Sequence, residues 1–197
     1  MKAAIFDSAH TDSGSYVRIG EVSRPAMEAG HVLLRVVACG VCRTDLHIVE
    51  RDLPPVRQQL IPGHQIVGEV VDGQTAELPL GTRVGVSWMG GVDGECWYCR
   101  HGMENLCDNP TFTGYTVNGG YAEYAAVRAD FAFPLPAGLD DVHVAPWPLC
   151  YARVSSAFGL SVLPGWNVAS GWDYSALAAP QVWRFLSCNP GIARSML

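Results

Sequence analysis

The sequence has few charges and almost no lysine. Charged residues make up 16% of its 197 residues, and Lys2 is the only lysine among 13 Lys and Arg residues. The net charge of −6 provides no basic surface for nucleic acid or acidic lipid. No apolar run approaches the roughly 18–20 residues of a membrane-spanning helix, and the N-terminus lacks the apolar segment of a secretory signal. We therefore expect a cytoplasmic protein that binds neither nucleic acid nor membranes.

The chain does have enough apolar residues for a sizeable core. Hydrophobic residues make up 49% of it, which argues against disorder. The seven cysteines are odd in number, and two pairs have the C-x2-C spacing. Without a signal peptide, this pattern favours thiolates that bind metal over a disulfide framework.

Short strands separated by turns are predicted over residues 1–146. Each candidate is rich in β-branched or aromatic residues and is bounded by Gly, Pro, Asp or Asn. The candidates are Lys2–Phe6, Tyr16–Val22, Val32–Ala38, Ile66–Val71, Arg83–Ser87 and Tyr121–Val127. No helical periodicity of useful length interrupts them. We predict a mostly β domain that forms an irregular, mainly antiparallel barrel.

Residues 147–197 have a different character. They hold four of the six Trp residues and a single acidic residue, Asp173. Neither a helical nor a strand period emerges from them. We predict no fold for this tail and treat residues 1–146 as the domain.

The clearest metal motif is the C-x2-C-x7-C run of Cys96, Cys99 and Cys107. Three thiolates within twelve residues, with Gly-containing turns between them, can close around one tetrahedral Zn²⁺. Asp93 stands three residues before Cys96, where a further cysteine would complete the set, and its carboxylate can be the fourth ligand. Four protein ligands predict a structural zinc lobe, and the alternative is a loop with free thiols.

Two further ligand types occur earlier, at Cys42 in Cys-Arg-Thr-Asp-x-His (42–47) and His64 in Pro-Gly-His (62–64). By themselves they are only candidate ligands, because a lone His beside Gly is also typical of a turn residue bonded to the backbone.

These motifs occur together with Gly-x-Arg-Val-Gly-Val (81–86) and Gly-Gly-Tyr-Ala-Glu-Tyr (119–124). In this order and spacing, the set resembles the zinc-dependent alcohol dehydrogenases of the medium-chain dehydrogenase/reductase family over residues 1–146. The resemblance implies a GroES-like β-barrel with a zinc-binding lobe. It also implies an enzyme that interconverts alcohols with aldehydes or ketones, using zinc and NAD or NADP, and a family that is usually homo-oligomeric.

The resemblance implies ligands for a catalytic zinc. Cys42 and His64 would bind the metal, and Asp45 would orient His64. The third ligand of the family is a cysteine after an Ala-Pro-rich stretch, and Cys150 lies near that place. The fourth position would stay open for water or the alcohol oxygen. One departure is Gln65, where the family often has Glu, which leaves less negative charge near the metal.

The resemblance also implies roles around that metal. Thr44 would pass the alcohol proton outward, and His47 would continue the relay to solvent. Arg43 would meet the cofactor pyrophosphate as a cation. Trp88 would line the substrate pocket, although a lone Trp after a strand is equally typical of a core residue.

The sequence lacks the Gly-x-Gly-x-x-Gly/Ala fingerprint and the roughly 130–150 residues of a Rossmann domain that would bind the nicotinamide. We expect a truncated chain that is inactive alone. The tail is interpreted as translation out of frame or as a disordered remnant. In the shifted frame, each codon consists of the last base of one present codon and the first two bases of the next. The genetic code then forces Leu at 150–151, Glu at 166–167 and Gly at 172–173, and it permits a Gly-x-Gly-x-x-Ala run after them.

Two alternatives remain at this stage. One is a non-enzymatic, zinc-stabilised β-barrel that binds a partner, because fold alone does not establish function. The other is one half of a split dehydrogenase whose cofactor domain is a separate chain. The trio Thr44, Asp45 and His47 beside Cys42 favours enzyme ancestry, since a purely structural barrel has no use for a proton relay.

Overall fold

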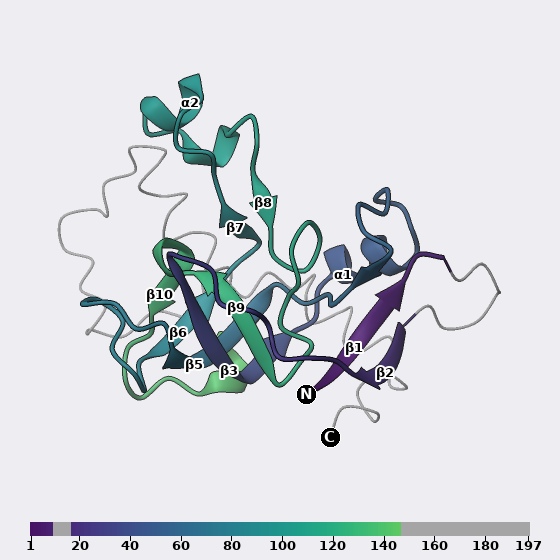
Figure 1. Cartoon of the computed structure of the whole chain (residues 1–197), viewed down its shortest axis with the longest axis horizontal. Coiled ribbons are helices and arrows are strands. Elements are labelled where there is room, and N and C mark those ends of the chain that lie inside the picture. Colours follow the sequence, from purple (N-terminus) through teal and green to yellow (C-terminus); the bar gives the residue numbers. More distant parts are fainter. Residues whose placement is uncertain (10–16, 147–197) are drawn as a thin grey trace, which may run out of the picture. The chain divides into compact units, whose positions relative to one another are not determined.

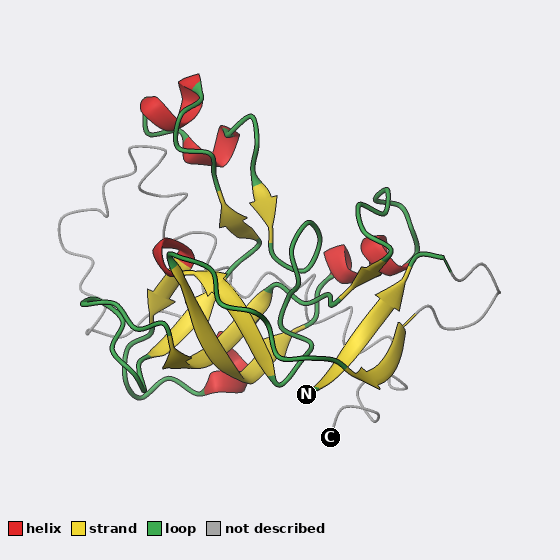
Figure 2. Ribbon diagram, in the orientation of Figure 1, coloured by secondary structure: helices red, strands yellow, loops and turns green. Residues whose placement is uncertain are grey.

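The structure is a computed structural model that describes residues 1–9 and 17–146, so the expectations for Cys150 and the tail lie outside the described residues. Strands dominate this part of the chain (Figures 1 and 2). They are β1 (Lys2–Asp7), β2 (Val17–Glu21), β3 (His31–Gly40), β4 (Gln59–Leu60), β5 (Gln65–Asp72), β6 (Arg83–Val86), β7 (Met89–Gly91), β8 (Thr111–Phe112), β9 (Tyr124–Arg128) and β10 (Ala132–Pro134). The helices are α1 (Arg43–Val49), α2 (Trp97–Arg100) and α3 (Asp141–Val144), with 3-10 turns η1 (Glu104–Leu106) and η2 (Ala129–Phe131).

A five-stranded sheet in the order β10-β6-β5-β3-β9 forms the main layer. All pairs of these strands are antiparallel, and Leu34 of β3 lies opposite Val70 of β5 and Ala125 of β9. The β3–β5 register shifts between Leu33 and Leu34 and again between Val36 and Ala38. Such bulges bend and twist a strand. The sheet therefore curls into a half-barrel, which confirms the predicted mostly β, GroES-like architecture.

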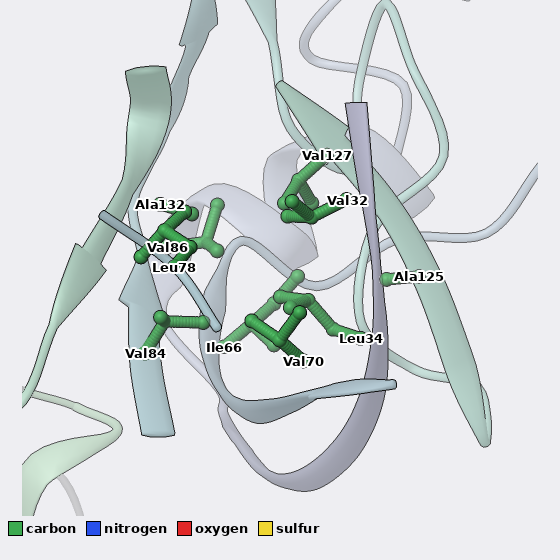
Figure 3. Close-up of a cluster of buried hydrophobic side chains, with 10 residues drawn as sticks. All are labelled: Val32, Leu34, Ile66, Val70, Leu78, Val84, Val86, Ala125, Val127 and Ala132. Carbon is green, nitrogen blue, oxygen red and sulfur yellow. The ribbon is translucent and has the colours of Figure 1, made fainter. Parts of the chain in front are cut away.

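The apolar core lies inside this curl (Figure 3). Its side chains come from strands of the sheet and from the loop before β6. They are Val32, Leu34, Ile66, Val70, Leu78, Val84, Val86, Ala125, Val127 and Ala132. Small β-branched residues dominate because they pack well on a strongly curved, pleated surface. Removal of this apolar surface from water supplies the main stabilising free energy of the domain.

Two smaller sheets complete the described part. One has the order β2-β1-β4, and the other is the β7-β8 pair. The β7–β8 pair carries the segment with α2 and η1, which projects from the curled sheet in Figure 1. Among the described residues, no helix is long and apolar enough to cross a membrane.

Five of the six predicted strands lie within one or two residues of an observed strand where the structure describes them. The sixth, Tyr121–Val127, begins later, at Tyr124. The Tyr121 N–H instead donates to the Pro62 carbonyl before His64, and the Glu123 N–H donates to the Lys2 carbonyl of β1. The sequence has no helical periodicity of useful length over these residues, and α1, a helix of seven residues capped by Cys42, is too short to produce one.

Candidate metal centres

Cys42 is held at the start of α1 by two reciprocal hydrogen bonds. Its Sγ accepts from the Thr44 backbone N–H at 3.3 Å, and its own N–H donates to Asp45 Oδ2 at 2.9 Å. This is a capping box with a sulfur in the place of the usual hydroxyl. The Cys-x-x-Asp spacing is the signal for this cap in the sequence, but it is easily overlooked because Cys is not a preferred N-cap residue.

His64 meets Cys42 from the start of β5. Its ring is buried, and its Nε2 lies 3.2 Å from Cys42 Sγ. Its Nδ1 lies 3.5 Å from Asp45 Oδ1, and the same oxygen accepts from the Gly63 N–H at 3.2 Å. The Asp45 carboxylate therefore joins the first turn of α1 to the Pro-Gly-His turn.

The electrostatics of the three groups favour their charged forms. Burial raises the pKa of Cys42, but hydrogen bonds from His64 and Thr44 outweigh it and leave the pKa below its ordinary value. Burial likewise raises the pKa of Asp45, yet its hydrogen bonds with His64 and with the Cys42 N–H lower it overall. Burial lowers the pKa of His64, but hydrogen bonds with Asp45 and Cys42 raise it to about 9. These directions favour negative charge on the sulfur and the carboxylate around the His64 ring, and a metal cation would take the place of a proton on Nε2.

This arrangement fits a zinc ion. The ligand atoms of Cys42, Asp45 and His64 all lie within 4.8 Å of one another. A sulfur and a nitrogen on one tetrahedral zinc are about 3.5 Å apart, close to the 3.2 Å between Cys42 Sγ and His64 Nε2. The carboxylate behind Nδ1 is the usual partner of a metal-bound histidine.

The structure places only some of the other residues that the resemblance implies at this site. Thr44 lies next to the Cys42 sulfur, to which its backbone N–H donates at 3.3 Å. His47 lies further along α1, and its Nδ1 is 2.7 Å from Asp52 Oδ2, a partner that the sequence analysis missed. Arg43 begins α1 and is exposed to solvent.

Trp88 lies against the metal cluster. Its ring meets the His64 ring edge-on, with centroids 5.2 Å apart and an interplanar angle of 81°. It also stacks on Phe112 at 4.8 Å and on Tyr115 at 5.9 Å. Trp88 thus joins an aromatic wall that begins at His64, and it also packs against the small apolar cluster around Phe6.

Cys39 is close in sequence to Cys42 but belongs to the packing of the barrel. It lies on β3, partly buried against the apolar core. Burial, together with the negative charge of Asp45, raises the pKa of this thiol to about 12. Cys39 therefore stays a neutral thiol and acts as a small hydrophobic side chain.

The second cluster is the projecting lobe. One ligand atom from each of Asp93, Cys96, Cys99 and Cys107 lies within 4.8 Å of the others. Backbone N–H groups donate to the sulfurs: Asp93 N lies 3.4 Å from Cys107 Sγ, and Cys99 N lies 3.4 Å from Cys96 Sγ. Such donors stabilise thiolates, so the cluster is suited to a cation.

Asp93 is oriented by three donors. Asn109 Nδ2 lies 3.0 Å from Asp93 Oδ2, and the N–H groups of Glu95 and Cys96 each lie 3.1 Å from Oδ1. The Asn109 amide, followed by the Cys96 N–H, holds the pKa of Asp93 well below its ordinary value. Burial and then the hydrogen bond with Cys96 raise the pKa of Cys99 to about 12. Three sulfurs and one carboxylate fit a closed, tetrahedral zinc site.

Gly63 is a position where the site needs glycine. Its φ of +93° lies in the left-handed region, and an added Cβ would lie 2.6 Å from Tyr121 Cδ1 and 2.9 Å from Cys39 Sγ. We expect Gly63→Ala to lower the free energy of unfolding by about 2–4 kcal/mol, through backbone strain and overpacking. Urea unfolding followed by circular dichroism measures this. Gly138→Ala is the matched control, because Gly138 has φ +86° but nothing within 4 Å of its Cβ. Equal losses in the two variants would contradict the packing argument.

A curled antiparallel half-barrel with a Cys–His–Asp cluster and a cysteine lobe defines a zinc-binding β domain. The chain belongs to the alcohol dehydrogenase GroES-like domain family, whose model matches residues 28–137. It is 44% identical over 149 residues to an alcohol dehydrogenase of Geobacillus stearothermophilus, covering 74% of this chain and 43% of that protein.

Solved structures similar to it include the following two enzymes. One is a cobalt- and zinc-bound thermostable alcohol dehydrogenase from Pyrobaculum aerophilum, with a TM-score of 0.64 and 29% identity over 75% of this chain and 44% of that one. The other is an acetophenone reductase from Geotrichum candidum in complex with NAD, with a TM-score of 0.63 and 30% identity over 73% of this chain and 42% of that one. The chain thus spans about two fifths to one half of the length of such relatives.

Proposed function

We propose that residues 1–146 are the zinc-binding catalytic domain of an alcohol dehydrogenase, which interconverts small alcohols with aldehydes or ketones using NAD or NADP. The observation that supports this best is the contact of Cys42 Sγ with His64 Nε2, backed by the Asp45 carboxylate on Nδ1. Family membership and the zinc and NAD bound by similar structures agree with it. The reducing cytoplasm, where thiols persist, suits its cysteines.

In this proposal each residue of the Cys42 site has a separate task. Cys42 and His64 hold the catalytic zinc, and Asp45 holds the His64 ring in the tautomer that leaves Nε2 free for metal. When bound, zinc is a Lewis acid that lowers the pKa of an alcohol. Cys150, outside the described residues, is the proposed third ligand.

The proton and the two substrates would be handled by side chains around that metal. Thr44 takes the alcohol proton at its hydroxyl, and His47 passes it to solvent. The partly exposed ring of His47 is suited to this, since its Nδ1 is engaged by Asp52. Arg43 meets the cofactor pyrophosphate, and Trp88 lines the substrate side of His64. The hydride step belongs to the nicotinamide.

Asp93, Cys96, Cys99 and Cys107 hold a second, structural zinc in this proposal. The four ligands leave no position open for a substrate. The task of this ion is to order the lobe, whose segment has only a short helix and a 3-10 turn between its cysteines.

For residues 147–197 we propose translation out of frame from a point between 146 and 150. The forced Leu, Glu and Gly of the shifted frame support this. The match to an alcohol dehydrogenase of Moraxella sp. covers 87% of the chain, which is more than residues 1–146 make up, so this match extends into the tail. The sequence of the coding DNA therefore tests the proposal. A shifted frame that is open and encodes Gly-x-Gly-x-x-Ala supports the proposal, and early stops in that frame contradict it.

The decisive experiment counts zinc and measures turnover on the purified 197-residue chain. We expect two zinc ions per chain and no change in NAD(P)H absorbance with primary alcohols or aldehydes. The same chain with the Geobacillus enzyme's remaining residues fused after residue 146 is expected to oxidise alcohols. One zinc that is lost only on mutation of the lobe would favour a non-enzymatic barrel. Turnover restored by a separate cofactor-domain chain would favour a split enzyme.

A further inference from the structure

The two arms of the lobe bring Asn109 face to face with Asp93. Gly91 of β7 lies opposite Thr111 of β8 in the antiparallel pair at the base of the lobe. The same register, continued by two residues into the lobe on each arm, places residue 93 opposite residue 109. The two side chains meet there, with Asn109 Nδ2 3.0 Å from Asp93 Oδ2. The strand pairing therefore sets up this contact, which the spacing of the cysteines does not reveal.

Asn109 contacts two of the four members of the lobe cluster. Its backbone N–H donates to Cys107 Sγ at 3.4 Å, and its side-chain amide donates to the Asp93 carboxylate. An ionised carboxylate can only accept hydrogen bonds, so the amide presents its NH2 group to Asp93. The backbone bond survives substitution by any residue other than proline, whereas the side-chain bond needs the amide. The two contacts can therefore be separated by mutation.

The two oxygens of Asp93 have partners from different arms of the lobe. Oδ1 accepts from the N–H groups of Glu95 and Cys96, which follow Asp93 in the same loop. Oδ2 accepts from Asn109, which comes from the opposite arm. The bonds to Oδ1 alone would leave the carboxylate free to pivot about that oxygen, and the bond to Oδ2 prevents this rotation. A ligand that is already held in one orientation loses less conformational entropy on binding.

We propose that Asn109 is the positioning residue that lets a carboxylate serve in a site otherwise built of thiolates. The inference rests on the structural zinc of the proposed function, because it concerns a residue that holds one ligand of that ion. A thiolate presents a single ligand atom, whereas a carboxylate can bind metal through one oxygen or through both. Asn109 engages Oδ2 and so favours binding through one oxygen, as a four-coordinate zinc site requires.

Asn109→Ala tests this, because it removes the amide and keeps the backbone N–H that donates to Cys107. We expect the zinc affinity of the lobe to fall about tenfold, at the lower end of the range typical of partners behind a metal ligand, because the Asp93–Asn109 pair is exposed to water. Competition against a chromogenic chelator measures this loss. With cobalt in place of zinc, the d–d bands of the lobe ion should shift as the oxygen ligand reorients.

Asn105→Ala is the matched control within the same lobe. Asn105 lies in η1, and the side-chain and backbone groups that donate to Asp93 come from other residues. We expect this variant to keep both the zinc affinity and the cobalt spectrum of the unmodified chain. Unchanged affinity and spectrum in Asn109→Ala, or equal changes in the two variants, would overturn the inference.

A double-mutant cycle shows whether Asn109 acts through Asp93. Asp93→Ala removes the carboxylate, and the amide then has no ligand to orient, while three thiolates remain to bind zinc. We expect Asn109→Ala to lower affinity about tenfold in the unmodified chain and to have no effect in the Asp93→Ala background. Equal losses in both backgrounds would overturn the inference, because Asn109 would then act on the fold of the lobe. The proposed function fails differently: the lobe of the unmodified chain would bind no zinc, and Cys107→Ser would leave the zinc count unchanged.

Discussion

Cys107→Ser is expected to reduce the zinc content of the chain from two ions to one and to disorder the lobe. Cys107 is the buried member of the lobe cluster, and its sulfur accepts from the N–H groups of Asp93 and Asn109. Binding of a structural zinc contributes on the order of 10 kcal/mol in small zinc domains. The residual Asp-Cys-Cys set should therefore release zinc to a chelator at least a hundredfold more readily. Metal analysis after gel filtration and the fluorescence of Trp97 report the two effects.

Cys39→Ala is the matched control for the lobe. It too removes one cysteine sulfur, from a partly buried position, but among the described residues Cys39 is outside both candidate metal clusters. We expect this variant to keep two zinc ions and to have an only slightly lower free energy of unfolding, because little packing is lost. If Cys39→Ala lost a zinc, or if Cys107→Ser kept both, the assignment of the lobe ligands would be wrong.

His64→Ala should remove the other zinc and leave the lobe ion in place. The substitution deletes one of the proposed ligands and leaves Asp45, with a relative exposure of 4%, without the His64 ring as its partner. Breaking a buried charged pair by removal of one partner typically costs about 3–5 kcal/mol. We therefore expect a lower thermal midpoint even in metal-free protein, measured with chelator present.

The control for His64→Ala is His143→Ala. His143 also lies beside a carboxylate, that of Asp140, but both side chains are largely exposed. Its loss should change neither the zinc count nor the thermal midpoint, because exposed ion pairs contribute little. A fusion with a complete cofactor domain should lose alcohol oxidation in His64→Ala and retain it in His143→Ala. Full activity of His64→Ala would contradict the proposed catalytic metal.

The two metal clusters differ in how far they could be predicted from the sequence. The lobe ligands occur within fifteen residues, so the chain itself keeps them close and their spacing was informative. Cys42 and His64 are 22 residues apart, and residue types alone left His64 as a possible turn residue. From the sequence, only the family resemblance assigned Cys42 and His64 to one metal site. The distance between the two side chains in the structure then supported a common site.

Helix α1 shows why local rules failed at the site itself. Its seven residues are too few for a periodic pattern, and its N-cap is a cysteine. The bond from the Thr44 N–H to Cys42 Sγ and the bond from the Cys42 N–H to Asp45 make this cap effective, because a cysteine sulfur can accept the N–H group that a Ser hydroxyl usually would. The same local geometry that starts the helix therefore orients the proposed zinc ligand.

The sequence by itself determined the mostly β class, the strand segments and the cysteine lobe. These depend on alternation, turn residues and short spacings, which act between near neighbours along the chain. Only the tertiary structure decided that the Tyr121 hydroxyl donates to the Gly40 carbonyl and that Trp88 lies edge-on to His64. Such contacts join segments whose separation in space depends on how the sheet curls, and the bulges and register of β3 and β5 set that curl.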